Sequence, residues 1–490
     1  MLKPSFFILL ISICFGQYCF GQADRAKVLA ETITESALRK HVKTLSADDM
    51  EGRETGSPGQ KKAAIYIMQQ FAKQEIQPFN GSYFQRFALN TVNPNQIKVT
   101  VNKQALHFFK DFIHYSNFNN VKSKSKQAVF VGYGEQAALN DTRFSLQDQS
   151  VFLLAHRGEG DRESLQKRIN AIGKKGAKMI FVVENQLDLT EQYLKSKKQF
   201  LATDTFEFPV PVLCVSKQWA DSTFRVSSNF KLNKWLKRKK KKNIRLNIAV
   251  DVNVDIIDGS KSSENVVAFI EGDELRDEVI VLLAHYDHLG LKGKEVYNGA
   301  DDNASGTAAL IEMAEAFNLA KEMGGGIKRS VLILLVAGEE KGLLGSQYYC
   351  QNPLFSMEQT KAVLNIDMIG RTDQDHYGKP NYLYVIGSNF ISPDLHRINE
   401  EQNDKYSQLH LDYRYNDKKD PNRFYFRSDH YPFAMRNVPA IFYFSGIHSD
   451  YHRTTDTYDK IDFSKLQLLS RHIFYTAWRL VNMEESLKKH

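Results

Sequence analysis

From Asn265 onward, short runs of consecutive apolar residues alternate with segments in which apolar residues recur every three or four positions. The runs are typical of strands buried on both faces of a sheet, and the second pattern is typical of helices. The predicted strands are Val266–Glu271, Val279–Ala284, Val331–Ala337, Ala362–Ile366, Leu383–Ile386 and Ala440–Phe444, and the predicted helices are about Ala304–Lys321, Gly345–Gln351, Asp394–Asn403 and Phe463–Met483. This alternation predicts an α/β fold with a mostly parallel, mixed sheet sandwiched by helices.

Two further helices are predicted near the start of the chain. One covers Thr34–Leu45 with Thr34 as its N-cap, and the other begins at Ser57, where an N-cap residue precedes a proline, and runs to about Phe71. The segment between them, Met50–Gly56, is predicted to be a loop.

The pattern changes between about Asn117 and Phe230, where short strands recur around a single helix. The predicted strands are Ala128–Val131, Val151–Ala155, Met179–Val183 and Pro209–Val215, and the helix is Arg162–Ile172. Ile244–Val254 then alternates like one further strand. We therefore predict that residues 23–115 and 246–490 build one main domain and that residues 116–245 form a β-rich domain inserted into it.

Residues 1–22 have the composition of a secretory signal peptide. Lys3 supplies a positive charge, Phe6–Phe15 is mostly apolar, and Gly21 lies at a cleavage site of small or polar residues. We expect a secreted or periplasmic mature protein. No later run reaches the ~18 apolar residues of a membrane span, so we expect no stable membrane insertion. Cys214 and Cys350 then remain, and the sequence leaves open whether they pair.

Composition and charge change this picture little. The 490 residues contain 25% charged residues, as in an ordinary globular protein, and the net charge is +8. The basic run Lys237–Lys242 supplies six of these charges, so the rest of the chain is near +2. No aromatic-rich surface surrounds the run, which favours a solvated linker over a nucleic-acid partner.

Ionisable side chains follow almost every strong strand of the main domain. The carboxyl ends of parallel strands meet at one edge of a sheet, so we expect these side chains to converge there. They are His285 and Asp287 after the second strand, Glu339 and Glu340 after the third, Asp367 after the fourth, His448, Asp450 and His452 after the last, and Asp302 at the head of a helix.

This set of side chains fits a pair of Zn²⁺ ions, because zinc takes imidazole nitrogen and carboxylate oxygen. Asp302, Glu340 and Asp367 bring three negative charges against four positive ones, and a hydroxide would supply the fourth. His285 and His452 would be neutral ligands, and the two oxygens of Asp302 could bridge both ions.

The neighbours of these ligands suggest supporting roles. Asp287 shares a face of extended chain with His285 and could accept the other ring N–H of that histidine. Glu339 and Glu340 should diverge, so one could bind metal while the other acts as a general base; spacing alone leaves open which does which.

Five motifs resemble the M28 family of zinc aminopeptidases in sequence and in order: AHYDH, GADDNASG, AGEEKGLLGS, NIDMIG and YHRTTDT. SDHYPF followed by VPAIFYFSG is similar to the same family, and so is MEGRETGSPG near the start of the chain. The dense part of the resemblance covers Glu264 to about Ile461. The insert more loosely resembles a protease-associated domain, in VFVGYG, LLAHRG, GAKMIFVV and PVPVLCVS.

The resemblance implies two zinc ions per chain and a peptide substrate with a free N-terminus. It implies that Asp302 bridges the ions, that Glu339 is the general base and that Asp287 orients His285. The implied metal ligands are His285, Asp302, Glu340, Asp367 and His452.

Three other functions stay open as alternatives. A glutaminyl cyclase would use the same fold with one zinc, a glutamate-type carboxypeptidase would need a basic substrate pocket, and a non-catalytic protein would use the insert as a binding surface. Ser428-Asp429-His430 superficially suggests a serine hydrolase, but no Gly-x-Ser-x-Gly elbow surrounds it. His288, His430 and His448 receive no role, and neither side-chain preference nor oligomeric state follows from the sequence.

Overall fold

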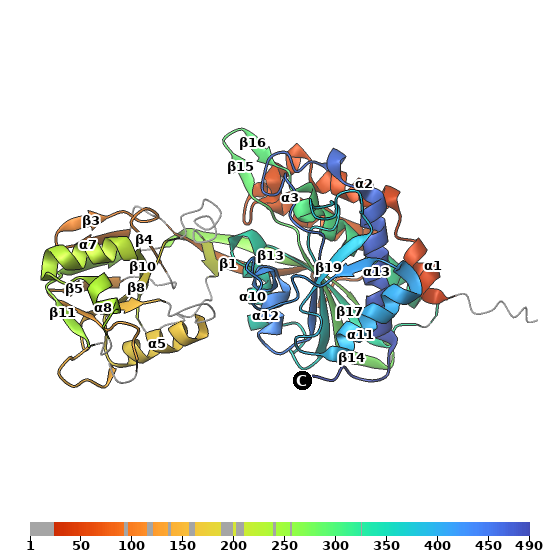
Figure 1. Ribbon diagram of the computed structural model, residues 1–490. Coiled ribbons are helices and arrows are strands. Elements are labelled where there is room, and N and C mark those ends of the chain that lie inside the picture. The colour runs from red at the N-terminus through yellow and green to blue at the C-terminus, as the bar shows by residue number, and fades with distance from the viewer. Residues whose placement is uncertain are drawn as a thin grey trace, which may run out of the picture.

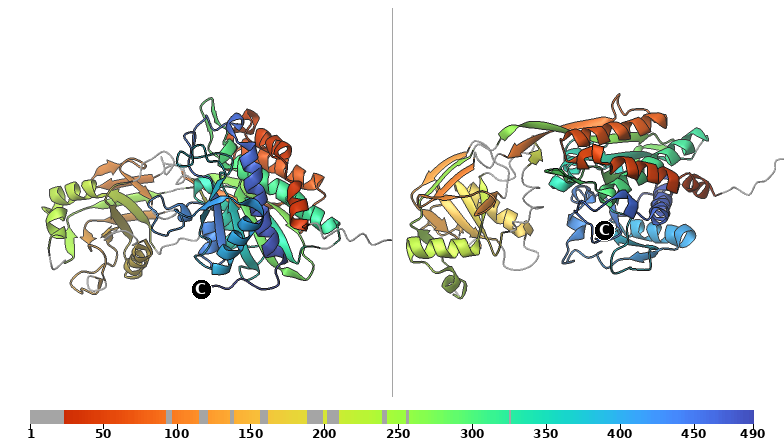
Figure 2. Two further views of the ribbon diagram at one scale, coloured as in Figure 1. Left: turned by 45° about the vertical axis from the view of Figure 1, so that its right-hand side comes forward. Right: turned by 90° about the horizontal axis from the view of Figure 1, so that it is seen from above.

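The computed structural model describes two lobes (Figure 1), and two further views separate the same lobes (Figure 2). The described residues are 24–92, 97–114, 121–135, 139–155, 162–187, 199–201, 210–238, 242–254, 257–324 and 326–490. The predicted signal peptide, residues 1–22, lies outside them. Among the described helices, none has both the length and the apolar character that crossing a membrane requires.

The larger lobe is built on a nine-stranded sheet with the order β20-β19-β21-β18-β14-β17-β13-β1-β9. Its central strands β21, β18, β14 and β17 are mutually parallel, whereas β13 and β1 are antiparallel to their neighbours. The expected mixed sheet is therefore confirmed, with its parallel part at the centre. The bounds are β1 (Phe84–Val92), β9 (Gln199–Leu201), β13 (Ile257–Ile270), β14 (Leu275–His285), β17 (Arg329–Val336), β18 (Thr360–Ile366), β19 (Tyr382–Ile386), β20 (His410–Asp412) and β21 (Ala440–Phe444).

Helices cover both faces of this sheet, as the alternating side chains of β14 show. Ile280 and Leu282 belong to a core cluster with α9 and α13, whereas Val281 and Leu283 belong to a second cluster with residues of α10 and α12. With both faces apolar, polar side chains of these strands are left to their ends. The helices of the lobe are α1 (Arg25–Glu31), α2 (Glu35–Leu45), α3 (Pro58–Lys73), α9 (Gly306–Glu322), α10 (Leu344–Gln351), α11 (Pro393–Gln402), α12 (His430–Ala434) and α13 (Phe463–Asn482).

Both predicted helix starts near the N-terminus are confirmed. The side chain of Thr34 accepts from the backbone N–H of Ala37, and that of Ser57 accepts from the backbone N–H of Gln60. The segment between the two helices is more ordered than a plain loop, since Asp48–Arg53 forms short 3₁₀ turns. These turns pack against the hairpin of β15 (Gly290–Lys292) and β16 (Glu295–Tyr297).

The smaller lobe contains a six-stranded sheet of order β11-β6-β7-β8-β10-β4 and a four-stranded sheet of order β3-β2-β12-β5. Strands β6, β7, β8 and β10 are parallel and correspond to the four strands predicted in the insert. The bounds are β2 (Ile97–Val101), β3 (Gln104–Leu106), β4 (Phe112–His114), β5 (Val121–Ser125), β6 (Ala128–Phe130), β7 (Ser150–Leu154), β8 (Met179–Glu184), β10 (Val212–Ser216), β11 (Ile244–Leu246), β12 (Val250–Val254), α5 (Arg162–Lys174), α7 (Lys217–Ser228) and α8 (Leu232–Leu236).

The strand pairing indicates bounds for the insert that differ from residues 116–245. Strands β2, β3 and β4 precede residue 116, yet they pair with strands of the smaller lobe. The single strand expected over Ile244–Val254 is instead two strands, β11 and β12, in different sheets. We therefore propose that the insert spans residues 97–254, with the long antiparallel pair β1 and β13 joining it to the larger lobe (Figure 1).

The two cysteines that follow the predicted signal peptide do not pair. Cys214 lies in β10 of the smaller lobe and Cys350 lies in α10 of the larger lobe, and both are buried free thiols. The fold is therefore held together without a bond between them.

Candidate metal centre

The structure brings the five predicted metal ligands together at one edge of the nine-stranded sheet. His285 is the last residue of β14, and Asp367 follows the last residue of β18. Glu340 lies in the short turn after β17, His452 lies in the loop after β21, and Asp302 lies in the turn that precedes α9. The rule that parallel strand ends converge thus gathers residues that are up to 167 positions apart in the sequence.

These side chains form two groups of nitrogen and oxygen atoms that share Asp302. In the first group, His285 Nε2 lies 3.3 Å from Asp367 Oδ1 and 3.4 Å from Asp302 Oδ1. In the second group, His452 Nε2 lies 3.0 Å from Asp302 Oδ2 and 3.3 Å from Glu340 Oε1. The two oxygens of Asp302 therefore face different groups, which is the arrangement that a bridging carboxylate requires.

His288, to which the sequence gave no role, also lies in the second group. Its Nδ1 atom is 3.0 Å from Glu340 Oε1 and 3.7 Å from Asp302 Oδ2, and the ring is fully buried. The imidazoles of His288 and His452 lie edge to face with their centroids 5.8 Å apart. In the sequence, only the position of His288 three residues after His285 could have indicated that it joins this group. That spacing matches neither one face of a strand nor a helix that continues from β14.

Asp287 is held differently from what the sequence predicted. The oxygen nearest to His285 Nδ1 is the main-chain carbonyl of Asp287 at 3.1 Å, while its carboxylate oxygen is 3.8 Å away. That carboxylate instead accepts from Thr55 Oγ1 at 2.6 Å and from the backbone N–H of Glu339 at 3.3 Å. Asp287 therefore contacts both the first ligand and the turn that carries the glutamate pair.

The two adjacent glutamates diverge, as expected, and their proton affinities differ. Burial raises the pKa of Glu339 well above its usual range; Glu340 and Asp367 add to the rise, and His285 opposes it. Burial also works against the ionised form of Glu340, but His452 and His288 outweigh it and lower the pKa of Glu340 to about 2. Glu340 is thus suited to bind a cation, and Glu339 is suited to take up and release a proton.

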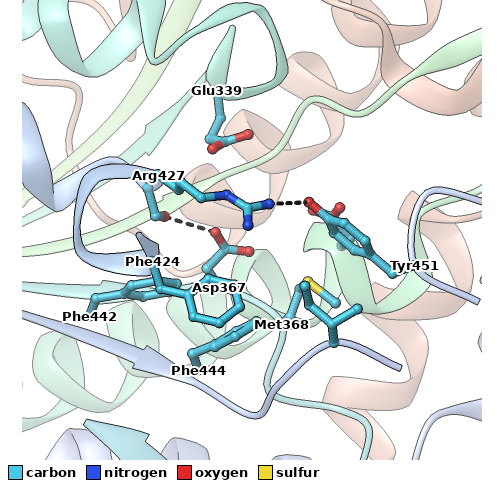
Figure 3. A pocket seen from close by; sticks show the side chains of 11 residues that line it. Glu339, Asp367, Met368, Phe424, Arg427, Phe442, Phe444 and Tyr451 are labelled. Carbon is cyan, nitrogen blue, oxygen red and sulfur yellow. Dashed lines mark hydrogen bonds between the residues drawn. The ribbon is translucent and has the colours of Figure 1, made fainter. Parts of the chain in front are cut away.

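Glu339 lines an open pocket of about 360 Å³ beside the ligand groups (Figure 3). Asp302 and Asp367 form part of the same wall, and Ser428 Oγ donates to Asp367 Oδ2 at 2.8 Å. Tyr451 stacks on His452 with their ring centroids 3.8 Å apart. The remaining lining is mostly apolar and consists of Met368, Phe424, Phe442, Phe444 and Ile447, with Arg427 across the pocket.

The segment Met50–Gly56, predicted as a loop, helps to hold the backbone that carries two of the predicted ligands. Arg53 is buried, and its guanidinium donates to the main-chain carbonyls of Tyr286, Asn298 and Gly299 at 2.8, 2.7 and 2.9 Å. These carbonyls flank the two ligands His285 and Asp302 in the sequence. The sequence did not identify Arg53, because a lone arginine in a loop carries no pattern that tells which carbonyls it will meet.

The donor atoms fit a divalent metal such as zinc. Glu340 Oε1 and both ring nitrogens of His288 are buried, and although Nδ1 and Oε1 lie 3.0 Å apart, none of these atoms forms a hydrogen bond of good geometry within the described part of the chain. Buried polar atoms are rarely left unpaired, and cations satisfy atoms of these types. Several carboxylates within one buried cluster also need positive charge nearby, which two divalent ions would provide.

Part of the chain is similar to known peptidases. Residues 265–477 match the model of peptidase family M28. A probable zinc metalloprotease of Leptosphaeria maculans is 30% identical over 207 residues, which is 36% of this chain and 46% of that protein. Leucine aminopeptidase 2 of Trichophyton rubrum is 28% identical over 252 residues, 46% of this chain and 47% of that protein. The chain thus spans less than half the length of these two relatives.

A solved structure resembles the fold over nearly its whole length. The aminopeptidase from Aneurinibacillus sp. strain AM-1 superposes with a TM-score of 0.58, covers 95% of this chain and 97% of that chain, and is 19% identical. At this identity the likeness concerns the fold alone. The family match covers residues 265–477, less than half of the chain, and contains all five predicted metal ligands; over this part the chain is similar to peptidase family M28.

Proposed function

We propose that the protein is a two-zinc aminopeptidase that removes N-terminal residues from peptides. The observation that carries the proposal is the position of Asp302, whose two oxygens face separate nitrogen and oxygen groups beside a pocket that contains Glu339. The signal-like composition of residues 1–22 supports a secreted or periplasmic location.

Each ion would have its own terminal ligands. His285 and Asp367 would hold one ion, Glu340 and His452 would hold the other, and Asp302 would bridge them. Zinc at such a site lowers the pKa of water and polarises a substrate carbonyl. His288 lies close enough to Glu340 to orient that carboxylate.

Glu339 would serve as the general base. Its side chain projects into the pocket (Figure 3), and burial raises its pKa well above its usual range, which favours uptake of a proton. It would take a proton from the attacking water and pass it to the leaving amine. Asp287 would keep Glu339 in place, since it accepts from the backbone N–H of that residue.

The pocket would select an apolar N-terminal side chain. Met368, Phe442 and Phe444 offer it an apolar surface, and each methylene removed from water there contributes about 0.8 kcal/mol. We therefore expect leucyl and phenylalanyl substrates to be cleaved faster than glycyl substrates.

The test is a panel of aminoacyl anilides, assayed with and without a chelator and with added Zn²⁺. We expect hydrolysis of the leucyl anilide that the chelator abolishes and zinc restores. Glu339→Gln should keep its zinc, measured by elemental analysis, yet lose activity by at least about a hundredfold, as for loss of a general base. Retained turnover in that variant would remove Glu339 from the mechanism.

A parallel incubation with a glutaminyl peptide separates the alternative reaction on this fold. Formation of a cyclised N-terminus without hydrolysis of any anilide would replace the aminopeptidase proposal by a cyclase. Wild-type protein that binds zinc and turns over neither substrate would support a binding role for the chain instead.

A further inference from the structure

Arg427 has no ion-pair partner among the described residues, although it lines a pocket that also contains carboxylates. Its side chain is exposed and lines the same pocket as Asp302, Glu339 and Asp367, yet it forms no ion pair with any described residue. By contrast, the nearby Arg371 pairs with Asp450 at 3.0 Å. The guanidinium of Arg427 is therefore available to form an ion pair with a ligand bound in the pocket.

Two aromatic side chains fix the position of this guanidinium. Its Nη2 atom donates to the hydroxyl of Tyr451 over 3.4 Å, and its Cζ atom lies 5.1 Å from the ring centroid of Phe424. Figure 3 shows the side chain extending across the pocket toward Tyr451. A guanidinium carries five N–H donors in a planar fork, so most of them stay available to a ligand. A carboxylate matches that fork with two parallel hydrogen bonds.

Among the described residues that line the pocket, Arg427 alone offers a positive charge to a carboxylate on the substrate. Five of its lining side chains are apolar, and three others are themselves carboxylates. Apart from the neutral hydroxyls of Ser428 and Tyr451, a substrate anion would therefore find a favourable protein partner in this lining only at Arg427, which is also its one positive charge. The sequence analysis set a basic pocket as the requirement for substrates of this kind, and Arg427 meets it.

We propose that Arg427 binds a free carboxylate of the substrate and makes very short peptides, above all dipeptides, the preferred substrates. The inference rests on the proposed aminopeptidase function. The apolar surface takes the N-terminal side chain, so the carboxylate belongs to the second residue. One residue advances the chain by about 3.8 Å. The guanidinium is separated from the ligand His452 by a single intervening ring, that of Tyr451, so the second residue lies within its reach.

The test compares Leu-Leu with Leu-Leu amide, which differ only in the terminal charge. We expect wild-type kcat/KM to be about ten to a hundred times higher for the free acid, the range of a charge-assisted pair. In Arg427→Gln this ratio should fall toward one, mainly through KM, and Arg427→Lys should retain part of it. Arg436→Gln is the matched control, because Arg436 is an exposed arginine of the same segment outside the pocket lining.

A second pair, glutamyl and leucyl anilide, identifies the source of the carboxylate. If Arg427→Gln selectively loses the glutamyl anilide, the bound carboxylate is an acidic N-terminal side chain, which supports the role of Arg427 and corrects the dipeptide preference. A wild-type acid-to-amide ratio near one, or ratios unchanged by Arg427→Gln, would overturn the proposal.

Calorimetric binding of Leu-Leu to the wild type and to Arg427→Gln keeps this inference separate from the function on which it rests. If the wild type hydrolyses none of these substrates, the aminopeptidase proposal is wrong. Weaker dipeptide binding by Arg427→Gln would still support the carboxylate site, and equal binding by both proteins would refute it.

Discussion

Replacing Arg53 by methionine tests how the ligand-bearing segment 285–302 is held. The arginine side chain is 1% exposed, and its guanidinium donates to the carbonyls of Tyr286, Asn298 and Gly299 and also to that of Leu45 at the end of α2. Burial lowers the pKa of Arg53 to about 10, although nearby carboxylates oppose the drop, so the group stays charged at neutral pH. Methionine preserves part of the apolar stem and removes every donor.

The four hydrogen bonds set the size of the effect. A hydrogen bond to a charged group contributes about 1.5–3 kcal/mol, so four give a nominal 6–12 kcal/mol, roughly. Neighbouring bonds are not additive, and water can reach part of the freed backbone, so we expect a net loss of about 4–5 kcal/mol, as for breaking a buried charged network. Lysine keeps the charge but cannot reach four acceptors at once, so Arg53→Lys should recover only part of the loss.

Hydrogen exchange followed by mass spectrometry measures this loss locally. A 4 kcal/mol loss corresponds to roughly a thousandfold faster exchange for amides that open with the segment. We expect this acceleration in peptides covering 285–302 and no change in the smaller lobe. Arg329→Met is the matched control, because Arg329 is also a buried arginine that donates to carbonyls, those of Leu480 and Met483 at the end of α13. Acceleration below tenfold, or the same acceleration in 285–302 from the control, would refute the reasoning.

Three further predictions follow from single groups. Asp302→Asn should reduce bound zinc from two ions to less than one per chain by elemental analysis, and two retained ions would exclude a bridging role. Ser428→Ala removes the donor to Asp367 Oδ2 and should weaken zinc affinity by about tenfold to a hundredfold in chelator competition; unchanged affinity would contradict it. Lys465 is buried, and burial lowers its pKa from 10.5 to about 7, so its unfolded form binds more protons between those values. The free energy of unfolding of the wild type should therefore rise relative to Lys465→Met by up to about 1.4 kcal/mol per pH unit from pH 7 to pH 10 in urea titrations; a flat or falling difference would contradict this.

The parts of the fold that follow from local pattern were predicted from the sequence. The apolar runs gave the central strands, and the convergence of parallel strand ends gave the meeting of His285, Asp302 and Asp367. Both are consequences of short-range rules, the burial of both sheet faces and the chirality of strand–helix–strand connections. The length of the antiparallel flank was not predicted, because residues 258–265 of β13 are all polar or Gly and carry no strand pattern before the apolar run that begins at Val266.

The edges of the insert show the limit of such rules. Strand β2 alternates buried and exposed residues in the way a strand of the main sheet would, and nothing local states which partner it pairs with. The break between β11 and β12 was equally hidden, because Asn247, Ile248 and Ala249 continue the alternation of apolar and other residues while the chain changes sheets. Sheet membership depends on long-range pairing, and a single sequence records it only weakly.

The candidate metal centre was likewise predicted only in part. Spacing placed the predicted ligands in one region, but it could not give the orientation of Asp287, whose carboxylate lies 3.8 Å from His285 Nδ1 and accepts from Thr55 and from the backbone of Glu339. That orientation depends on the segment around Arg53. Its contact with the Asp287 carboxylate comes from Thr55, which precedes Asp287 by 232 residues. A segment that provides no predicted ligand therefore helps to fix Glu339, the proposed general base, because Thr55 donates to the Asp287 carboxylate that accepts from the backbone of Glu339. Loss of catalysis from substitution of Thr55 would thus arise through the position of Glu339, with zinc still bound.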